Sequence, residues 1–150
     1  MINISESIIL ISHRGNIHGP SIKENNPNWI LNHVIDYLGL NVEIDVWYID
    51  NELWLGHDKP QYKCPLKLVQ HKLAWCHAKN LEALEFLLLV GAHCFWHEND
   101  KRTLTSQGYI WTYPDQKPSK RGILVIERIL KDTDFNNTLG ICTDYTGVLA

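Results

Sequence analysis

The apolar and polar positions along the chain change period several times, and each change predicts an element of secondary structure. Residues 8–11 are an unbroken apolar run, which is typical of a buried strand. Apolar residues then recur at helical spacing and predict a helix over residues 27–38 that ends at Gly39. From residue 42 to residue 49 apolar and polar residues alternate, which is the period of a strand. The Asp50-Asn51 pair that follows predicts a tight turn into a hairpin.

The rest of the chain continues this alternation of strand-like and helix-like segments. Further strands are predicted over residues 52–55, 73–80, 93–98, 109–113, 123–126 and 140–144, and helical segments over residues 66–71, 81–90, 103–107 (at most one turn) and 128–132. Strands that alternate with helices are typical of an α/β fold with a mostly parallel sheet. A complete (β/α)8 barrel needs roughly 250 residues. The 150 residues of this chain therefore predict a compact TIM-type (β/α) barrel with several reduced or missing helices, formed as a single domain over residues 1–150.

Several predicted strands carry ionisable side chains near their ends, where parallel-sheet enzymes place their active sites. Glu43 and Asp45 project from the same face of their strand, because side chains two positions apart share a face. The whole set consists of His13, Arg14, Glu43, Asp45, His57, Asp58, His77 and Lys79. Together they offer carboxylates for a hard divalent cation, imidazoles for proton transfer and fixed cations for a phosphate. The cleavage of a phosphodiester requires these groups.

The order and spacing of these motifs resemble those of the glycerophosphodiester phosphodiesterases, within the wider superfamily of phosphatidylinositol-phospholipase-C-like phosphodiesterases. The matching segments are His13-Arg14-Gly15, Glu24-Asn25, Glu43-Ile44-Asp45-Val46, the turn over residues 50–53 that leads to His57-Asp58, Trp111-Thr112 and residues 140–145. The resemblance implies a metal-dependent phosphodiester hydrolase. It also implies a small phosphodiester substrate and a divalent metal cofactor, namely Mg²⁺, Ca²⁺ or Mn²⁺.

The resemblance assigns roles to the matching side chains. His13 and His57 would be the acid–base pair, and either one could be the base. Glu43 and Asp45 would bind the metal. The remaining roles are phosphate binding by Arg14 and Lys79 and a pocket wall at Trp111. The nucleophile could be water or a neighbouring hydroxyl of the substrate.

One position departs from the family pattern, because His77 stands where the family carries an acidic metal ligand. A neutral imidazole can ligate a divalent metal, and it suits Mn²⁺ or Zn²⁺ better than Ca²⁺. This departure leaves open a catalytically degenerate barrel that binds a phosphorylated ligand without turnover. A sugar- or nucleotide-processing lyase is a third alternative. His97, at another predicted strand end, is expected in the same pocket.

Composition indicates which binding partners and which cellular compartment to expect. The net charge of −3 gives no indication of a nucleic-acid partner, and the longest apolar stretch is too short to span a membrane. The four cysteines form no CxxC pair and residues 1–7 are too polar for a signal peptide, which together predict a cytoplasmic protein with reduced thiols. A barrel without some of its outer helices exposes a flank that a homodimer could cover.

Overall fold

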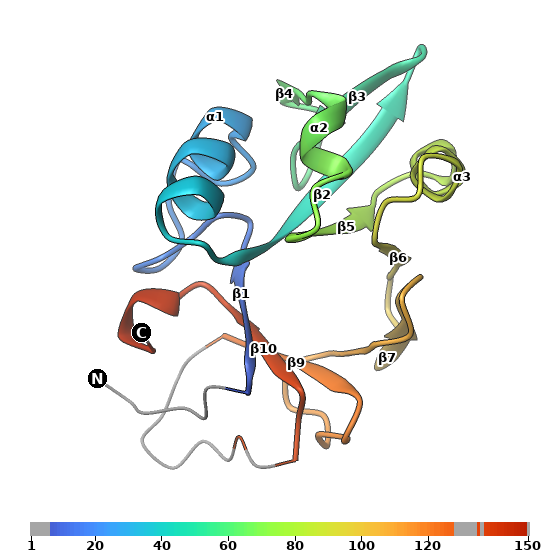
Figure 1. The fold of residues 1–150 in the computed structure, drawn as a ribbon. Coiled ribbons are helices and arrows are strands. Elements are labelled where there is room, and N and C mark those ends of the chain that lie inside the picture. Colours follow the sequence, from blue (N-terminus) through green and yellow to red (C-terminus); the bar gives the residue numbers. More distant parts are fainter. Residues whose placement is uncertain (1–6, 128–134, 136, 150) are drawn as a thin grey trace.

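The computed structural model describes residues 7–127, 135 and 137–149, which form a curled ten-stranded mixed sheet with a few short helices (Figure 1). The strands are β1 (Ile9–His13), β2 (Asn41–Ile49), β3 (Glu52–Leu55), β4 (Tyr62–Lys63), β5 (Ala74–Ala78), β6 (Cys94–Trp96), β7 (Arg102–Leu104), β8 (Ile110–Thr112), β9 (Gly122–Ile126) and β10 (Gly140–Thr143). The helical segments are α1 (Pro27–Trp29), the π-helix η1 (Ile30–Tyr37), α2 (Leu66–Val69), α3 (Leu81–Leu89) and the 3-10 helix η2 (Thr146–Val148).

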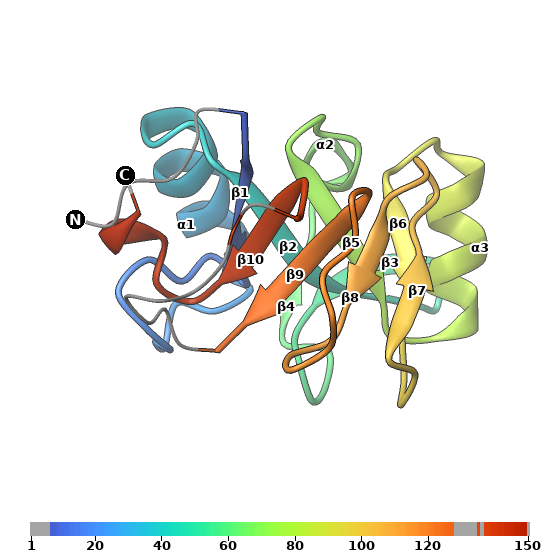
Figure 2. The same cartoon turned by 90° about the horizontal axis from the view of Figure 1, so that it is seen from below.

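Seven of the strands run parallel to one another in the order β6-β5-β2-β1-β10-β9-β8. The two ends of the chain therefore meet in the middle of the sheet, where β1 pairs with β10 (Figure 2). The antiparallel strands are additions to this parallel set: the β3–β4 pair extends from β2, and β7 pairs with β8. A hydrogen bond from Thr103 Oγ1 to the Trp96 carbonyl, 2.8 Å long, brings β7 next to β6.

The prediction of a TIM-type (β/α) barrel is wrong, because the protein is mostly β and its sheet forms a half-barrel. Helices α1, η1, α2 and α3 follow β1, β4 and β5, on the outside of the curl (Figure 1). From β6 to β9, by contrast, the described residues contain no helix, and the connections are β7 and a proline-containing loop. The β6–β8 connection uses its residues for strand β7, and the nine residues between β8 and β9 are fewer than the dozen or more that a crossover between parallel strands normally needs.

Two element predictions differ from the structure in detail. Residues 102–104 form strand β7 where at most a helical turn was expected, and residues 62–63 form the short strand β4 within an expected loop. The expected helix from residue 27 to residue 38 is present, but most of it is the π-helix η1. The helix predicted over residues 128–132 lies outside the described residues.

The alternation of β2 sorts its side chains onto the two faces of the sheet. Val42, Ile44 and Val46 are fully buried in a core that also contains Val34 of η1 and Leu87 of α3. Glu43 and Asp45 therefore project from the other face, toward the inside of the curl. A second apolar cluster, which includes Ile11, Trp75 and Trp111, fills part of this inside. The two carboxylates thus lie in the concave side of the sheet above an aromatic core.

Candidate active site

A cavity of about 700 Å³ opens at the carboxyl ends of the parallel strands, a size typical of small-molecule sites. It brings together the residues to which the sequence assigned a role in the site: His13, Arg14, Glu43, Asp45, His57, His77, Lys79, His97 and Trp111. Asp58, which belongs to the same set of ionisable strand-end residues, is 93% exposed and does not line the cavity. The residues with an assigned role come from six different strands or the loops that follow them. For all of them except His57 the parallel order of the strands explains the convergence, because the carboxyl ends of parallel strands meet at one edge of the sheet. His57 follows the antiparallel strand β3, which returns along β2 so that the Gly56 amide donates to the Asp45 carbonyl.

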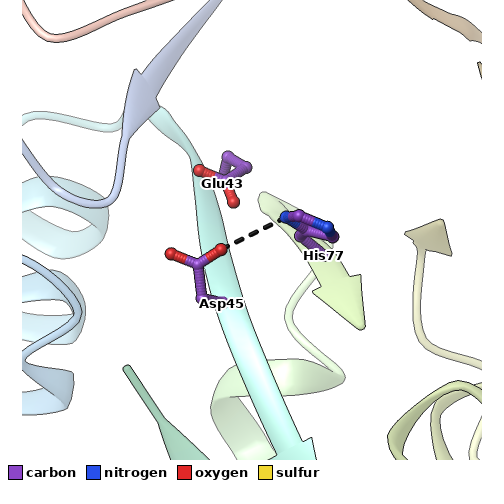
Figure 3. A group of neighbouring side chains, drawn as sticks. All are labelled: Glu43, Asp45 and His77. Atoms are coloured by element: carbon purple, nitrogen blue, oxygen red, sulfur yellow. Dashed lines mark ion pairs between the residues drawn. The ribbon is translucent and has the colours of Figure 1, made fainter. Parts of the chain in front are cut away.

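Glu43, Asp45 and His77 form the densest group of potential metal ligands in the described part of the chain. One ligand atom of each lies within 4.8 Å of the others. The sheet register sets this up, because Asp45 on β2 pairs directly with His77 on β5 and Glu43 lies two positions earlier on the same face. Figure 3 shows the Asp45 carboxylate turned toward the His77 ring with Glu43 beside it. Two carboxylates and an imidazole are a donor set that suits Mn²⁺ or Zn²⁺.

The hydrogen bonds of His77 define which ring nitrogen faces Asp45. Its Nε2 lies 3.0 Å from the main-chain carbonyl oxygen of His97, which can only accept, so Nε2 carries the hydrogen. Its Nδ1 lies 3.2 Å from Asp45 Oδ1. In a neutral imidazole this Nδ1 has a lone pair, which would face a carboxylate oxygen. Two acceptors at this distance require a cation with them, either a proton on Nδ1 or a bound metal.

Glu43 is a buried carboxylate that the protein leaves partly unsatisfied. The residue is 2% exposed, and its Oε2 accepts no hydrogen bond from the described residues. Burial, and then the nearby negative charge of Asp45, raise the pKa of Glu43 to about 7, although His13, His77 and Arg14 act in the opposite direction. A buried oxygen that accepts no hydrogen bond from the described residues and lies beside a second carboxylate fits a bound cation.

Asp45 is held in the ionised form by the groups around it. Burial alone would raise the pKa of Asp45, but the hydrogen bond and charge of His77 and the charge of Arg14 outweigh burial and lower it below its usual range. Asn25 donates from Nδ2 to Asp45 Oδ2 over 2.9 Å, and its Oδ1 accepts from the Asp45 amide over 3.0 Å. This pair of bonds fixes the carboxylate to the loop that follows β1.

His13 lies between two carboxylates at the end of β1. Its Nδ1 is 2.9 Å from Asp144 Oδ1, and its Nε2 is 3.5 Å from Glu43 Oε2. Burial lowers the pKa of His13, but the hydrogen bond to Asp144 and the charge of Glu43 raise it by more, so the pKa lies above its ordinary value. Asn16 donates to both Asp144 and Glu24 over 2.8 Å, which holds the Asp144 carboxylate in place. His13 is therefore an oriented imidazole whose Nε2 faces the buried carboxylates.

Arg14 lines the cavity but is engaged by carboxylates. Its Nε lies 3.3 Å from Asp45 Oδ2 and its Nη1 lies 3.6 Å from Glu24 Oε2. The backbone of Arg14 is in the left-handed region, with a φ of 58°, and the following Gly15 has a φ of 89°. This turn redirects the chain away from β1 and leaves the guanidinium at the cavity wall.

His57 and His97 also line the cavity, and each is paired with a nearby aspartate. The side chain of His57 is 43% exposed, and its Nδ1 lies 2.9 Å from Asp58 Oδ1. His97 Nδ1 lies at the same distance from Asp100 Oδ2, and its ring packs against Tyr113 with 4.1 Å between ring centroids. Lys79, in the loop after β5, completes the cationic groups of the cavity.

The structure adds site residues that sequence reasoning did not nominate. Asp144 orients His13, Asn16 holds Asp144, and Asn25 holds Asp45. Asn25 and Asp144 belong to segments that the family resemblance already matched, and that match was the only signal that could have nominated them. The cavity also has an aromatic and apolar wall, which consists of Trp96, Tyr113, Pro114, Tyr145 and Pro20 in addition to Trp111.

Comparisons with protein-family models, with curated proteins and with solved structures found no match for this chain. Among the described residues, no helix has the length and apolar character needed to cross a membrane.

Proposed function

We propose that this protein is a metal-dependent phosphodiester hydrolase whose site resembles that of the glycerophosphodiester phosphodiesterases. The observation that carries the proposal is the buried pair of carboxylates on β2, which has the His77 imidazole on one side and the His13–Asp144 pair on the other. Structural ion pairs are normally complete, whereas Glu43 Oε2 has no hydrogen-bond partner in the described part of the chain. An incomplete anionic cluster at the base of a 700 Å³ cavity is better explained by a ligand than by stability.

Glu43, Asp45 and His77 are the residues that would hold the divalent metal. The metal would supply Lewis acidity, which offsets the negative charge on a phosphoryl oxygen. Its identity is restricted by His77, because an imidazole ligand favours Mn²⁺ or Zn²⁺ over Ca²⁺. The hydrogen bond from His77 Nε2 to the His97 carbonyl would keep Nδ1 as the ligating atom, as the outer hydrogen bond of a metal-bound histidine usually does.

Side chains of the protein would carry out the proton transfers and bind the phosphate. His13 would accept the proton of the nucleophile at Nε2, while Asp144 holds its Nδ1–H and stabilises the imidazolium that results. His57 would donate a proton to the leaving alcohol. Arg14 and Lys79 would bind the non-bridging oxygens of the phosphate. The nucleophile would be water or a neighbouring hydroxyl of the substrate.

The proposal is tested by turnover of bis-p-nitrophenyl phosphate and a panel of glycerophosphodiesters, with Mg²⁺, Mn²⁺, Ca²⁺ or Zn²⁺ added to metal-free protein. We expect metal-dependent cleavage that falls by about 10²- to 10⁴-fold in Glu43→Gln. The control is Glu52→Gln, which removes an exposed carboxylate paired with Lys63 and should leave turnover unchanged. Wild-type protein that cleaves none of these substrates with any of the metals contradicts the proposal. Metal-dependent binding of the same esters without cleavage would support the alternative, a phosphate-binding protein without turnover.

A further inference from the structure

Two tryptophans donate their indole N–H to glycine carbonyls that lie next to proposed catalytic groups. Trp29 Nε1 donates to the Gly15 carbonyl over 2.9 Å, and Gly15 directly follows Arg14. Trp47 Nε1 donates to the Gly56 carbonyl over 2.7 Å, and Gly56 directly precedes His57. The same type of hydrogen bond, from an indole N–H to a glycine carbonyl, therefore occurs at both of the strand ends that carry the proposed acid–base histidines.

The Gly56 peptide needs such a contact because little else fixes His57. The side chain of His57 is 43% exposed, and its partner Asp58 is 93% exposed, so packing does not hold the imidazole. Its position depends instead on the backbone that enters the loop. That backbone is bound to β2 on both sides, because the Gly56 amide donates to the Asp45 carbonyl over 3.1 Å and the Gly56 carbonyl accepts from Trp47.

The turn at Gly56 leaves no room for a side chain at this position. A Cβ atom on Gly56 would lie 1.9 Å from the main-chain oxygen of Lys59, so the loop closes tightly over this residue. The two hydrogen bonds of Gly56 reach the same strand that carries Glu43 and Asp45. The distance from His57 to the two carboxylates is therefore set through Trp47 and the Asp45 main chain.

Trp29 holds the turn after β1 in a similar way. Gly15 has a φ of +89°, and a Cβ atom there would lie 3.0 Å from Ile30 Cγ1 and 3.3 Å from Trp29 Cδ1. The indole thus covers Gly15 closely and binds its carbonyl at the same time. Arg14 is also in the left-handed region, and its amide donates to the Glu43 carbonyl and its carbonyl accepts from the Asn25 amide, each over 2.9 Å. The Trp29 bond adds to these contacts at Gly15, on the far side of the strained residue.

We propose that Trp29 and Trp47 are positioning residues, whose indole N–H groups hold the backbone turns that place His13, Arg14 and His57 around the cavity. The expected effect on turnover rests on the proposed function, whereas the expected effect on backbone order does not. A displacement of about 1 Å in a catalytic group can lower turnover by as much as roughly 100-fold. Neither tryptophan lines the cavity, so substrate affinity should change little.

The test compares Trp47→Phe and Trp29→Phe with Trp75→Phe. Trp75 is a matched control, because its indole N–H also makes one hydrogen bond, to Asn41 Oδ1 over 2.9 Å, but at the opposite end of the strands. Each variant should lower Tm by at least about 3 °C, since each loses one hydrogen bond, and Trp75→Phe should lower it most, because Trp75 is 3% exposed and also loses buried ring volume. Only Trp47→Phe and Trp29→Phe should lower kcat, by about 10- to 100-fold, with KM within about twofold of wild type.

A second measurement separates this inference from the proposed function. ¹⁵N relaxation of the backbone amides should show lower order at Gly56 and His57 in Trp47→Phe and at Arg14 and Gly15 in Trp29→Phe, but at neither turn in Trp75→Phe. If wild-type protein has no turnover, the proposed function fails while this result still supports positioning. Unchanged amide order at both turns overturns the inference whatever the turnover. If a phenylalanine variant does not fold, 3-benzothienylalanine at the same position removes the N–H and keeps the ring shape.

Discussion

The parallel strands have a buried histidine at their carboxyl ends and another at their amino ends, and the surroundings of these two histidines are opposite. At the carboxyl end of β5, His77 faces the carboxylate of Asp45, and the hydrogen bond and negative charges around it raise its pKa even though burial lowers it. At the other end, His93 immediately precedes β6 and packs on the Trp75 ring with 4.2 Å between ring centroids. Its Nε2 lies 2.8 Å from the hydroxyl oxygen of Thr105, and burial lowers its pKa to about 4.

This contrast shows that partners rather than burial decide what a buried histidine can do. His93 is 5% exposed and sits among aromatic rings and a neutral hydroxyl, so it stays uncharged over the physiological range. His77 and His13 are enclosed too, but each faces carboxylates and is a candidate for a charged or metal-bound state. The aromatic end of the sheet therefore supports the fold, and the carboxylate end concentrates the groups that chemistry needs.

The largest predicted difference between the two ends is in turnover. His13→Asn should lower kcat by about 10³-fold, because it removes a proton acceptor that is oriented by Asp144. His93→Asn should leave kcat within about twofold of wild type, although it disturbs a buried site. Steady-state kinetics of both variants with bis-p-nitrophenyl phosphate measure this. Equal losses in the two variants would show that the two ends are not functionally distinct.

The next effect is on stability and concerns Glu43. A carboxylate with a folded pKa of about 7 binds a proton more tightly in the folded than in the unfolded state. The contribution of Glu43 to folding stability is therefore complete below about pH 4.5 and is lost as pH rises from about 4.5 to about 7. In metal-free protein, Glu43→Gln should therefore gain about 3 kcal/mol over wild type between pH 4.5 and pH 8. Urea unfolding at both pH values measures the gain. A constant difference between the two proteins would refute the raised pKa of Glu43.

The smallest effect has the opposite pH dependence and comes from His93. Its folded pKa of about 4 lies below the unfolded value of 6.5, so its contribution to stability is complete above pH 6.5 and is lost as pH falls toward 4. Wild-type protein should therefore lose roughly 2 kcal/mol more of its unfolding free energy on acidification than His93→Gln does. This figure is lower than the pKa shift alone would give, because partial access of water weakens the electrostatic effect. Urea unfolding of His93→Gln and wild type from pH 7 to pH 4.5 gives this difference. Parallel stability curves would mean that His93 is already charged in the folded protein.

Much of the first half of the chain could be predicted because its patterns are local. The alternation of β2 predicted that Glu43 and Asp45 share a face, and both line the cavity. The Asp50-Asn51 turn has φ values of 50° and 64°, as the hairpin prediction required. Helix α3 begins after Asn80, whose side chain accepts from the Ala83 amide, and is followed by Gly91 with a φ of 74°. Capping and turn residues act over a few positions and can be seen without the fold.

The fold class and the partners of the site could not be predicted, because they depend on contacts between distant segments. Strand β7 has only three residues and is stabilised by pairing with β8, which no local pattern shows. The β/α alternation of the first half does not continue beyond β6, so extending it produced the wrong barrel. The link between His13 and Asp144 joins residues that are 131 positions apart, and it exists because β1 pairs with β10.

The central claim is that Glu43, Asp45 and His77 form a metal site, and the most direct test is a Mn²⁺ titration of metal-free protein followed by electron paramagnetic resonance. We expect one tightly bound Mn²⁺ per wild-type chain. Binding should weaken by at least about 10-fold in His77→Phe and Glu43→Gln, and it should be unchanged in His93→Gln. Wild-type protein that binds no stoichiometric Mn²⁺, or variants at Glu43 and His77 that bind it as tightly as wild type, would contradict the claim.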